Sequence, residues 1–171
     1  SIHRGIDVAR AANINHIVAS TGSTSELAAK KIFKLPEQAF IDMGDFIGGM
    51  LKYLRKAPTP ILTIVGGFGK LTKLAQGNLD LHSRRSTINL NKLSEMVKSC
   101  GAPETLVEMC KQAHTSLEVL NNCTPSKIPI ANCVAKQARE VILATLAGPG
   151  EVNVLVVDRN GDIIGNSSSK K

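Results

Sequence analysis

A short apolar run, a polar loop and a stretch of helical spacing follow one another repeatedly in the first half of the chain. The apolar runs, which we expect to be strands, cover residues 16–20, 39–41 and 61–65. The helical patterns that follow them cover residues 26–34, 45–56 and the residues after 69. Strands that alternate with helices in this way form a parallel sheet. None of the runs alternates apolar with polar residues, which is typical of strands covered by helices on both faces.

The rest of the chain is mainly helical and ends in strands. Residues 1–12 have helical spacing, and residues 89–147 contain three or four further helical stretches. Residues 152–157 are a clear strand, and an Asn-Gly pair at 160–161 predicts a hairpin that returns through residues 163–164. We therefore predict an α/β fold with a parallel sheet of about five strands, covered by helices on both faces. A helical insertion at about 89–147 precedes the C-terminal strand and hairpin, and the tail from Gly165 is expected to be disordered.

Three loops follow the carboxyl ends of the first three strands, where parallel sheets bind ligands. They cover residues 21–26, 42–45 and 66–70. In the first, backbone N–H groups and hydroxyls could bind a ligand, or could only cap the next helix with help from Glu26; the residues concerned are Thr21, Gly22, Ser23, Thr24 and Ser25. In the second, Asp42 could bind ribose hydroxyls or act as a base, whereas Asp45 is expected to be a helix N-cap.

Glycines dominate the third loop, at Gly66, Gly67 and Gly69. The spacing is not that of a phosphate-binding P-loop, and residue 72 is Thr where a dinucleotide fingerprint would need glycine. Phosphoryl transfer and dinucleotide binding therefore have little support. We expect a loop that exposes its backbone to a ligand beside Lys70.

Positive charge gathers directly after this loop. The cluster contains Lys70, Lys73, His82, Arg84 and Arg85, with only Asp80 opposing it. Lysine and arginine side chains in a cleft suit a ligand with several carboxylates, and His82 could carry a proton near neutral pH. The alternative is a solvated basic face with a histidine held by packing. A serine hydrolase fits poorly, because the chain has no G-x-S-x-G motif.

Composition narrows the class of partner. The net charge of +7 favours an anionic partner, but aromatic residues are only 3% and there is no Trp, which argues against single-stranded nucleic acid. The four cysteines (Cys100, Cys110, Cys123 and Cys133) show no zinc spacing, and we expect buried free thiols in a reducing cytoplasm. No apolar run approaches the length of a membrane span.

Five segments together resemble a known family. They are SIHRGIDVARAA, ASTGSTSE, DMGDFIGGMLKYLRKAP, VGGFGKLTKLAQGNLDLHSRRS and IANCVAKQAREVILATLAG. These segments resemble the C-terminal half of the CbiD family, the cobalt-precorrin-5B (C-1)-methyltransferases of anaerobic cobalamin biosynthesis. The resemblance implies methyl transfer from S-adenosylmethionine to C-1 of a cobalt-containing tetrapyrrole, giving cobalt-precorrin-6A. It also implies that residues 1–171 form the C-terminal α/β domain and that an N-terminal domain is absent from this chain.

The resemblance turns the candidate residues into expected roles. Substrate carboxylates would be bound by Lys70, Lys73, Arg84 and Arg85, with His82 and Asp80 as catalytic candidates. The donor would be bound by Thr21, Gly22, Ser23, Thr24, Asp42, Gly66, Gly67 and Gly69. Cobalt would enter with the substrate, so we expect no protein metal site, no membrane or nucleic-acid partner, and an enzyme that could form a homo-oligomer. The alternative functions are a non-catalytic α/β module for a nucleotide or other anion and, from the net charge, a nucleic-acid binder.

Overall fold

A computed structural model describes residues 1–169 and confirms the predicted α/β class. Its sheet has the strand order β2-β1-β3-β4-β5. The strands are β1 (His16–Ser20), β2 (Phe40–Asp42), β3 (Ile61–Gly67), β4 (Glu151–Val157) and β5 (Ile163–Ser167). The first four are parallel and β5 runs antiparallel to β4, as a hairpin requires. The parallel pair β3–β4 joins residues on either side of the predicted helical insertion.

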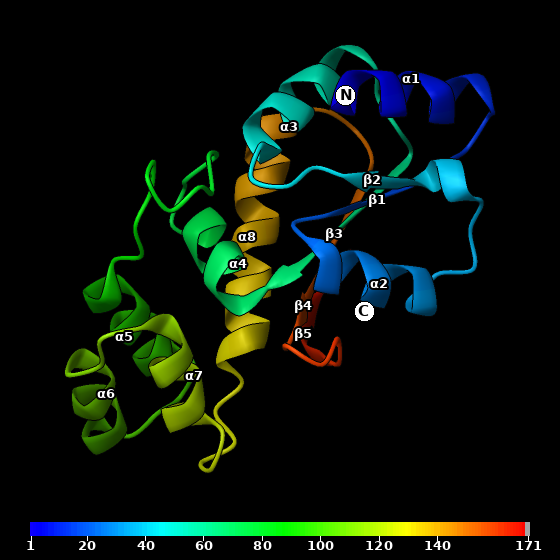
Figure 1. The fold of residues 1–171 in the computed structure, drawn as a ribbon. Coiled ribbons are helices and arrows are strands. Elements are labelled where there is room, and N and C mark those ends of the chain that lie inside the picture. Colours follow the sequence, from blue (N-terminus) through cyan, green and yellow to red (C-terminus); the bar gives the residue numbers. More distant parts are fainter. Residues whose placement is uncertain (170–171) are drawn as a thin grey trace.

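The helices follow the predicted order. They are α1 (Ile2–Ala11), α2 (Ser23–Ile32), α3 (Ile47–Lys56), α4 (Phe68–Ala75), α5 (Leu90–Ser99), α6 (Glu104–Lys111), α7 (Ser116–Cys123) and α8 (Ile130–Leu146), with a short 3-10 turn η1 (Glu37–Ala39). Figure 1 shows α5, α6 and α7 gathered on one side of α8, away from β1 and β2. The predicted insertion is therefore a helical group whose last member, α8, also packs against β4 and β5.

Helices cover both faces of the sheet, but unequally. The larger core contains Ile17, Ile64 and Val154 from the sheet, packed against α1, α3, α4 and α8. The smaller core lies on the other face, where Val18 and Val65 pack against α2. The helical pattern at residues 26–34 predicts Leu27 and Ile32 on the buried face. The inner face of α2 is made of small residues instead, and Leu27 is 63% exposed and Ile32 37%. The helical pattern at residues 45–56 likewise predicts Phe46 on the buried face, but Phe46 is 65% exposed because α3 begins after it.

The predicted glycine loop at residues 66–69 is wrong, because β3 continues through its first two glycines. Gly66 and Gly67 pair with Val156 and Val157 of β4, and α4 begins at the next residue. Gly66 is buried, and a Cβ there would lie 3.0 Å from Thr21 Cγ2. Its glycine serves close packing between strand ends and not exposure of the backbone to a ligand.

Capping of α2 by the loop at residues 21–25 is confirmed, but the expected contribution of Glu26 and the expected N-cap at Asp45 are wrong. Helix α2 begins at Ser23, and Ser25 takes the capping role expected of Glu26: the Gly22 N–H donates to Ser25 Oγ at 3.0 Å, and Oγ donates to the Gly22 carbonyl at 2.9 Å. Glu26 instead forms an ion pair with Lys30, at 3.2 Å. Asp45 is not the N-cap of α3, because its carboxylate pairs with a lysine from another element, described below.

The cysteines divide into two pairs. Cys110 and Cys123 are buried free thiols, as predicted. Cys100 and Cys133 form a disulfide between the end of α5 and the first turn of α8, with a Cα–Cα separation of 6.6 Å, so the prediction of free thiols is wrong for this pair. The two residues lie 33 positions apart on different helices, and their spacing carries no signal of this contact.

The expected disorder from Gly165 onwards is wrong for the first residues of the tail. Gly165, Asn166 and Ser167 belong to β5, whose pairing with β4 extends the hairpin beyond the predicted return strand. The Asn166 N–H also donates to Asn132 Oδ1 of α8, at 2.9 Å. Lys170 and Lys171 lie outside the described residues. Within those residues, no helix is both long and apolar enough to cross a membrane.

Candidate functional site

The strand order creates a crevice between β1 and β3. The chain leaves β1 for α2 on one face of the sheet and leaves β3 for α4, which packs with α8 on the other face. In open α/β sheets with the order 2-1-3-4-5, this point of divergence is where ligands bind. Here it opens into a cleft of about 1210 Å³. The cleft is lined by parts of residues 21–25, 67–70, 116–132 and 157–164.

The β1 side of the cleft separates structural from accessible hydroxyls. Thr21 and Ser25 are only 4% and 3% exposed, and Ser25 is used in capping α2. Ser23 and Thr24 are exposed and line the cleft, and neither hydroxyl is bonded within residues 1–169. A Cβ at Gly22 would meet no atom within 4 Å, so a ligand can approach the backbone there. Of the predicted donor loop, Gly22, Ser23 and Thr24 are therefore the groups open to a ligand.

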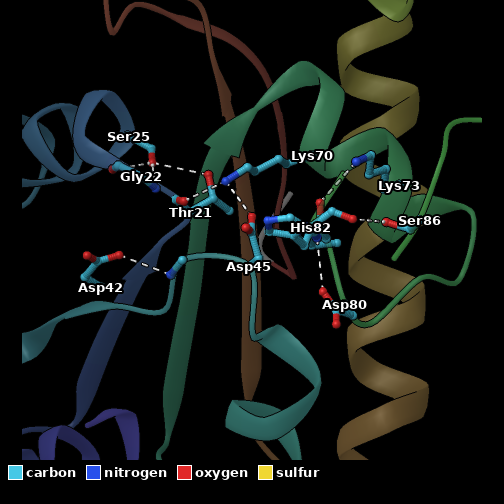
Figure 2. Close-up of polar contacts among 12 residues, drawn as sticks. Thr21, Gly22, Ser25, Asp42, Asp45, Lys70, Lys73, Asp80, His82 and Ser86 are labelled. Atoms are coloured by element: carbon cyan, nitrogen blue, oxygen red, sulfur yellow. Dashed lines mark hydrogen bonds and ion pairs between the residues drawn. The ribbon is translucent and has the colours of Figure 1, made fainter. Parts of the chain in front are cut away.

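The β3 side contributes two glycines and a lysine. Gly67 precedes the first residue of α4 and has open space where a Cβ would stand, whereas Gly69 faces Ser116 of α7. Lys70 Nζ lies 2.6 Å from Asp45 Oδ1 and donates to the Thr21 carbonyl at 3.1 Å. Figure 2 shows this lysine between the two loops that follow β1 and β2. Lys70 thus ties the three strand ends together, with its charge countered by Asp45.

Asp42 lies apart from this cleft. Its side chain is exposed, and Oδ1 accepts the Gly44 N–H at 3.1 Å, closing a turn in which Gly44 has a φ of +54°. It lines a separate shallow hollow beside Phe46. The strand-end carboxylate therefore has a structural task, and the structure does not bring it together with the loops after β1 and β3.

The basic residues predicted beyond α4 form a turn next to the cleft. Residues 80–86 do not line it; the turn is attached to the rim by the Leu81 N–H, which donates to the Asp45 carbonyl at 3.0 Å. Lys73 Nζ donates to the Leu81 carbonyl at 3.1 Å, as Figure 2 shows. Arg84 and Arg85 are exposed, and no salt bridge forms at either within residues 1–169. Of the predicted basic cluster, only Lys70 reaches the cleft.

His82 and Asp80 hold this turn together. Asp80 Oδ1 accepts the His82 N–H at 3.1 Å, as Figure 2 shows. His82 Nδ1 accepts the Arg84 N–H at 3.1 Å. Because Nδ1 acts as the acceptor, a neutral His82 ring carries its proton on Nε2. The exposed ring therefore presents an N–H donor in this conformation, which suits contact with a carboxylate.

Sequence reasoning missed several polar groups of the cleft, among them Arg159, Asn160 and Lys127. Arg159 and Asn160 stand in the turn that follows the carboxyl end of β4, and Lys127 stands in the connection between α7 and α8. The rule used for the first three loops could have found the turn after β4, because β4 is also parallel to β3. No local signal marks Lys127, whose place depends on how α7 and α8 pack.

A histidine and two cysteines have shifted pKa values, and all three lie away from the cleft. Burial lowers the pKa of His16, which faces α2, although nearby Glu151 acts in the opposite direction; the ring Nε2 lies 2.8 Å from Thr63 Oγ1. Burial also raises the pKa of Cys110 and, further helped by the neighbouring Cys110, that of Cys123 to about 12. Cys110 and Cys123 are parts of the larger core, and His16 is half-buried at the start of β1. Across residues 1–169, no group of three or more His, Cys, Asp or Glu side chains is placed to hold a metal ion.

Comparison with known proteins agrees with the resemblance. The family model described as CbiD, C-terminal domain, matches residues 80–168. Cobalt-precorrin-5B C(1)-methyltransferases of Brucella ovis, Brucella canis and Brucella melitensis biotype 2 are each 52% identical to the chain over 165 residues. The match covers 96% of this chain and 45% of each relative, so the chain spans about half the length of the curated relatives it matches. No solved structure matches the chain significantly. The chain belongs to the CbiD family.

Proposed function

We propose that this chain is part of an S-adenosylmethionine-dependent methyltransferase that methylates C-1 of cobalt-precorrin-5B. The product would be cobalt-precorrin-6A, in anaerobic cobalamin biosynthesis in the cytoplasm. Family membership and relatives of that name support the activity. The single observation that carries the proposal is the cleft at the divergence of β1 and β3, the position at which α/β sheets bind nucleotide-like ligands.

The donor would lie between the two strand ends. Ser23 and Thr24 offer free hydroxyls, and Gly22 and Gly67 leave space for a ligand to reach the backbone. Both α2 and α4 begin here, and the first N–H groups of a helix favour an anionic group such as the amino-acid carboxylate of the donor. Lys70 would contribute mainly by keeping the loops after β1, β2 and β3 in place.

Methyl transfer is a direct displacement. The electron pair at the ring carbon forms the new carbon–carbon bond while the bond from the methyl group to sulfur breaks, leaving S-adenosylhomocysteine. The protein's task is to align the two reactants in near contact. If the methylated ring must lose a proton, our candidates for the base that accepts it are His82 and Asp80, and Asp42 is a further candidate. Asp80 and Asp42 each keep a second carboxylate oxygen beside the one that closes their turn.

The rest of the site would come from sequence beyond this chain. The relatives are about twice as long as the matched region, so we propose that an N-terminal domain covers the cleft and completes the acceptor site. The exposed basic turn at residues 80–86 would then face that domain or the substrate. This arrangement would exclude water from the reacting groups.

Calorimetry with S-adenosylhomocysteine tests the donor site. We expect saturable binding that Gly67→Val weakens by about tenfold or more, because the new side chain fills cleft space. Gly67 has φ −75° and ψ 162°, which valine adopts without strain, so the melting temperature should change little. Gly49→Ala, on α3 with no atom near its Cβ position, is the matched control. If the wild-type protein in its longest natural form binds no S-adenosylhomocysteine, even with a corrinoid present, the donor assignment fails. A non-catalytic nucleotide or anion module would then be the better reading.

A further inference from the structure

The cleft has two chemically different halves. The half formed by the loops after β1 and β3 presents hydroxyls and backbone. The opposite half is formed by α7, the start of α8 and the β4–β5 hairpin, and it is mainly apolar, with Leu117, Leu120, Ile128 and Ile164. Leu117 is 41% exposed, which is high for a leucine on a helix packed against others. This second half, the apolar wall, exposes Leu117 to the cleft, whereas Leu120, Ile128 and Ile164 line the cleft and also pack against the larger core.

Two cations stand on that apolar wall without compensation. Lys127 and Arg159 are exposed, line the cleft, and form no ion pair within residues 1–169. The only acidic residue of the lining, Asp158, is turned to its own hairpin, because Oδ1 accepts the N–H groups of Asn160 and Asp162 at 2.9 and 3.0 Å. Lys70, the third cation of the lining, is already paired with Asp45. The unneutralised charge of the cleft thus belongs to Lys127 and Arg159.

The size of the cleft indicates more than one ligand. Single small molecules occupy pockets of roughly 300–1,000 Å³. The cleft measures about 1210 Å³, so it exceeds what one donor molecule needs. A transfer reaction also requires its two reactants to meet within one space. A polar half for the donor and an apolar, cationic half for the acceptor satisfy both requirements.

We propose that the half formed by α7, α8 and the β4–β5 hairpin binds the tetrapyrrole acceptor. Its apolar side chains would pack against the ring, and Lys127 and Arg159 would bind carboxylates on the ring's edge. This inference rests on the proposed function and assigns the acceptor to residues outside the basic cluster at 70–85. The exposed turn at 80–86 does not line this half.

Charge removal at the two positions tests the assignment. Lys127 has a φ of +56°, so Lys127→Asn removes the charge with a residue that tolerates this backbone, and Arg159→Gln does so in an exposed turn. Lys52→Gln with Lys56→Gln removes the same number of charges from exposed positions on α3 that do not line the cleft, and it is the matched control. The melting temperatures of all variants should lie within a few degrees of that of the wild-type protein, because these side chains are exposed.

The probe is uroporphyrin, a tetrapyrrole whose edge carries only acetate and propionate groups. It is titrated into the longest natural form of the protein, and binding is followed by fluorescence. The Lys127→Asn, Arg159→Gln double variant should bind it about tenfold or more weakly, the scale of a charge-assisted hydrogen bond, and with a weaker dependence on salt. The control should bind it as wild type does. S-adenosylhomocysteine binding should be unchanged in both.

Three results would overturn the inference. They are unchanged tetrapyrrole binding by the double variant, equal weakening by the control, and loss of S-adenosylhomocysteine binding in place of tetrapyrrole binding. The last would show that the two cations serve the donor carboxylate. In each case wild-type binding of S-adenosylhomocysteine would leave the proposed function standing. Absence of that binding in the wild-type protein counts against the proposed function itself.

Discussion

The contact between β5 and α8 permits a quantitative test of the fold. A Cβ added at Gly165 would lie 2.5 Å from the carbonyl carbon of Ala131, and 2.7 Å from the Ala131 Cβ and carbonyl oxygen. Two of these three atoms are backbone, so no side-chain rotation can relieve the overlap. Strand and helix would have to separate by about 1 Å to reach an ordinary contact distance of about 3.5 Å.

The cost follows from this geometry. Overpacking of this kind costs roughly 1–3 kcal/mol, and the upper part of the range applies because backbone must move. The alanine also reduces the freedom of the unfolded chain, which returns about 0.4–1 kcal/mol. We therefore expect Gly165→Ala to lower the free energy of unfolding by about 2 kcal/mol, and the melting temperature by about 4–8 °C.

Urea and thermal denaturation of the purified chain measure this loss. Gly49→Ala is the control: it lies inside α3 with open space at the Cβ position, and should gain about 0.5–1 kcal/mol. Adding Ala131→Gly to Gly165→Ala should recover only part of the loss, because the contact with the Ala131 carbonyl stays. If Gly165→Ala is as stable as wild type while Gly49→Ala behaves as expected, β5 does not approach α8 this closely.

Four other features give testable expectations. Burial holds the pKa of His16 below 6.5, so the free energy of unfolding should fall as the pH drops through 6.5 towards the folded-state pKa. Urea denaturation at about pH 7.5 and about pH 5.5 should show a smaller fall in His16→Gln than in the wild-type protein. Burial raises the pKa of Cys123 to about 12, so a thiol reagent should label it only after unfolding; labelling of the native protein would contradict its burial. Cys100→Ser should cost about 4 kcal/mol in oxidising buffer and little in reductant, and an equal cost in both would argue against the disulfide. Lys70→Met should lower the free energy of unfolding, measured by urea denaturation, by about 1–2 kcal/mol, because the ion pair with Asp45 is partly exposed. The double variant Asp45→Asn, Lys70→Met should lose less stability than the sum of the losses in the two single variants.

Local patterns predicted the elements that depend on local residues. The strand at 16–20 has the predicted bounds, and the strand from Ile61 begins where expected, because short apolar runs between polar loops identify buried strands. Gly66 and Gly165 were misread because glycine in a sequence usually marks a loop. In the structure both residues are in strands and allow another element to approach closely, which only the tertiary arrangement reveals.

The site was predictable where topology alone decides it. The loops after β1 and β3 share the cleft because parallel strands place their carboxyl ends on one edge. The same rule would have added Arg159, had the hairpin been considered as part of the rim. Lys127 and the apolar residues of α7 could not be predicted from the sequence, because their position depends on how the helical insertion packs against the sheet. The roles expected of Lys73, Arg84 and Arg85 stay predictions.

The parallel pairing of β3 with β4 has a consequence for how the chain folds. Thr63 and Asn153, whose side chains meet at 3.3 Å across these strands, lie 90 positions apart. Closing a loop of that length costs roughly 4 kcal/mol of chain entropy, and this cost precedes any stabilisation from the pairing of the two strands. Helices α5–α8 form within the loop from nearby contacts, and their packing shortens the effective distance between its ends. We therefore expect β4 to join the sheet late and slowly, after the insertion has collapsed onto α4, so that the cleft is among the last parts of the molecule to form.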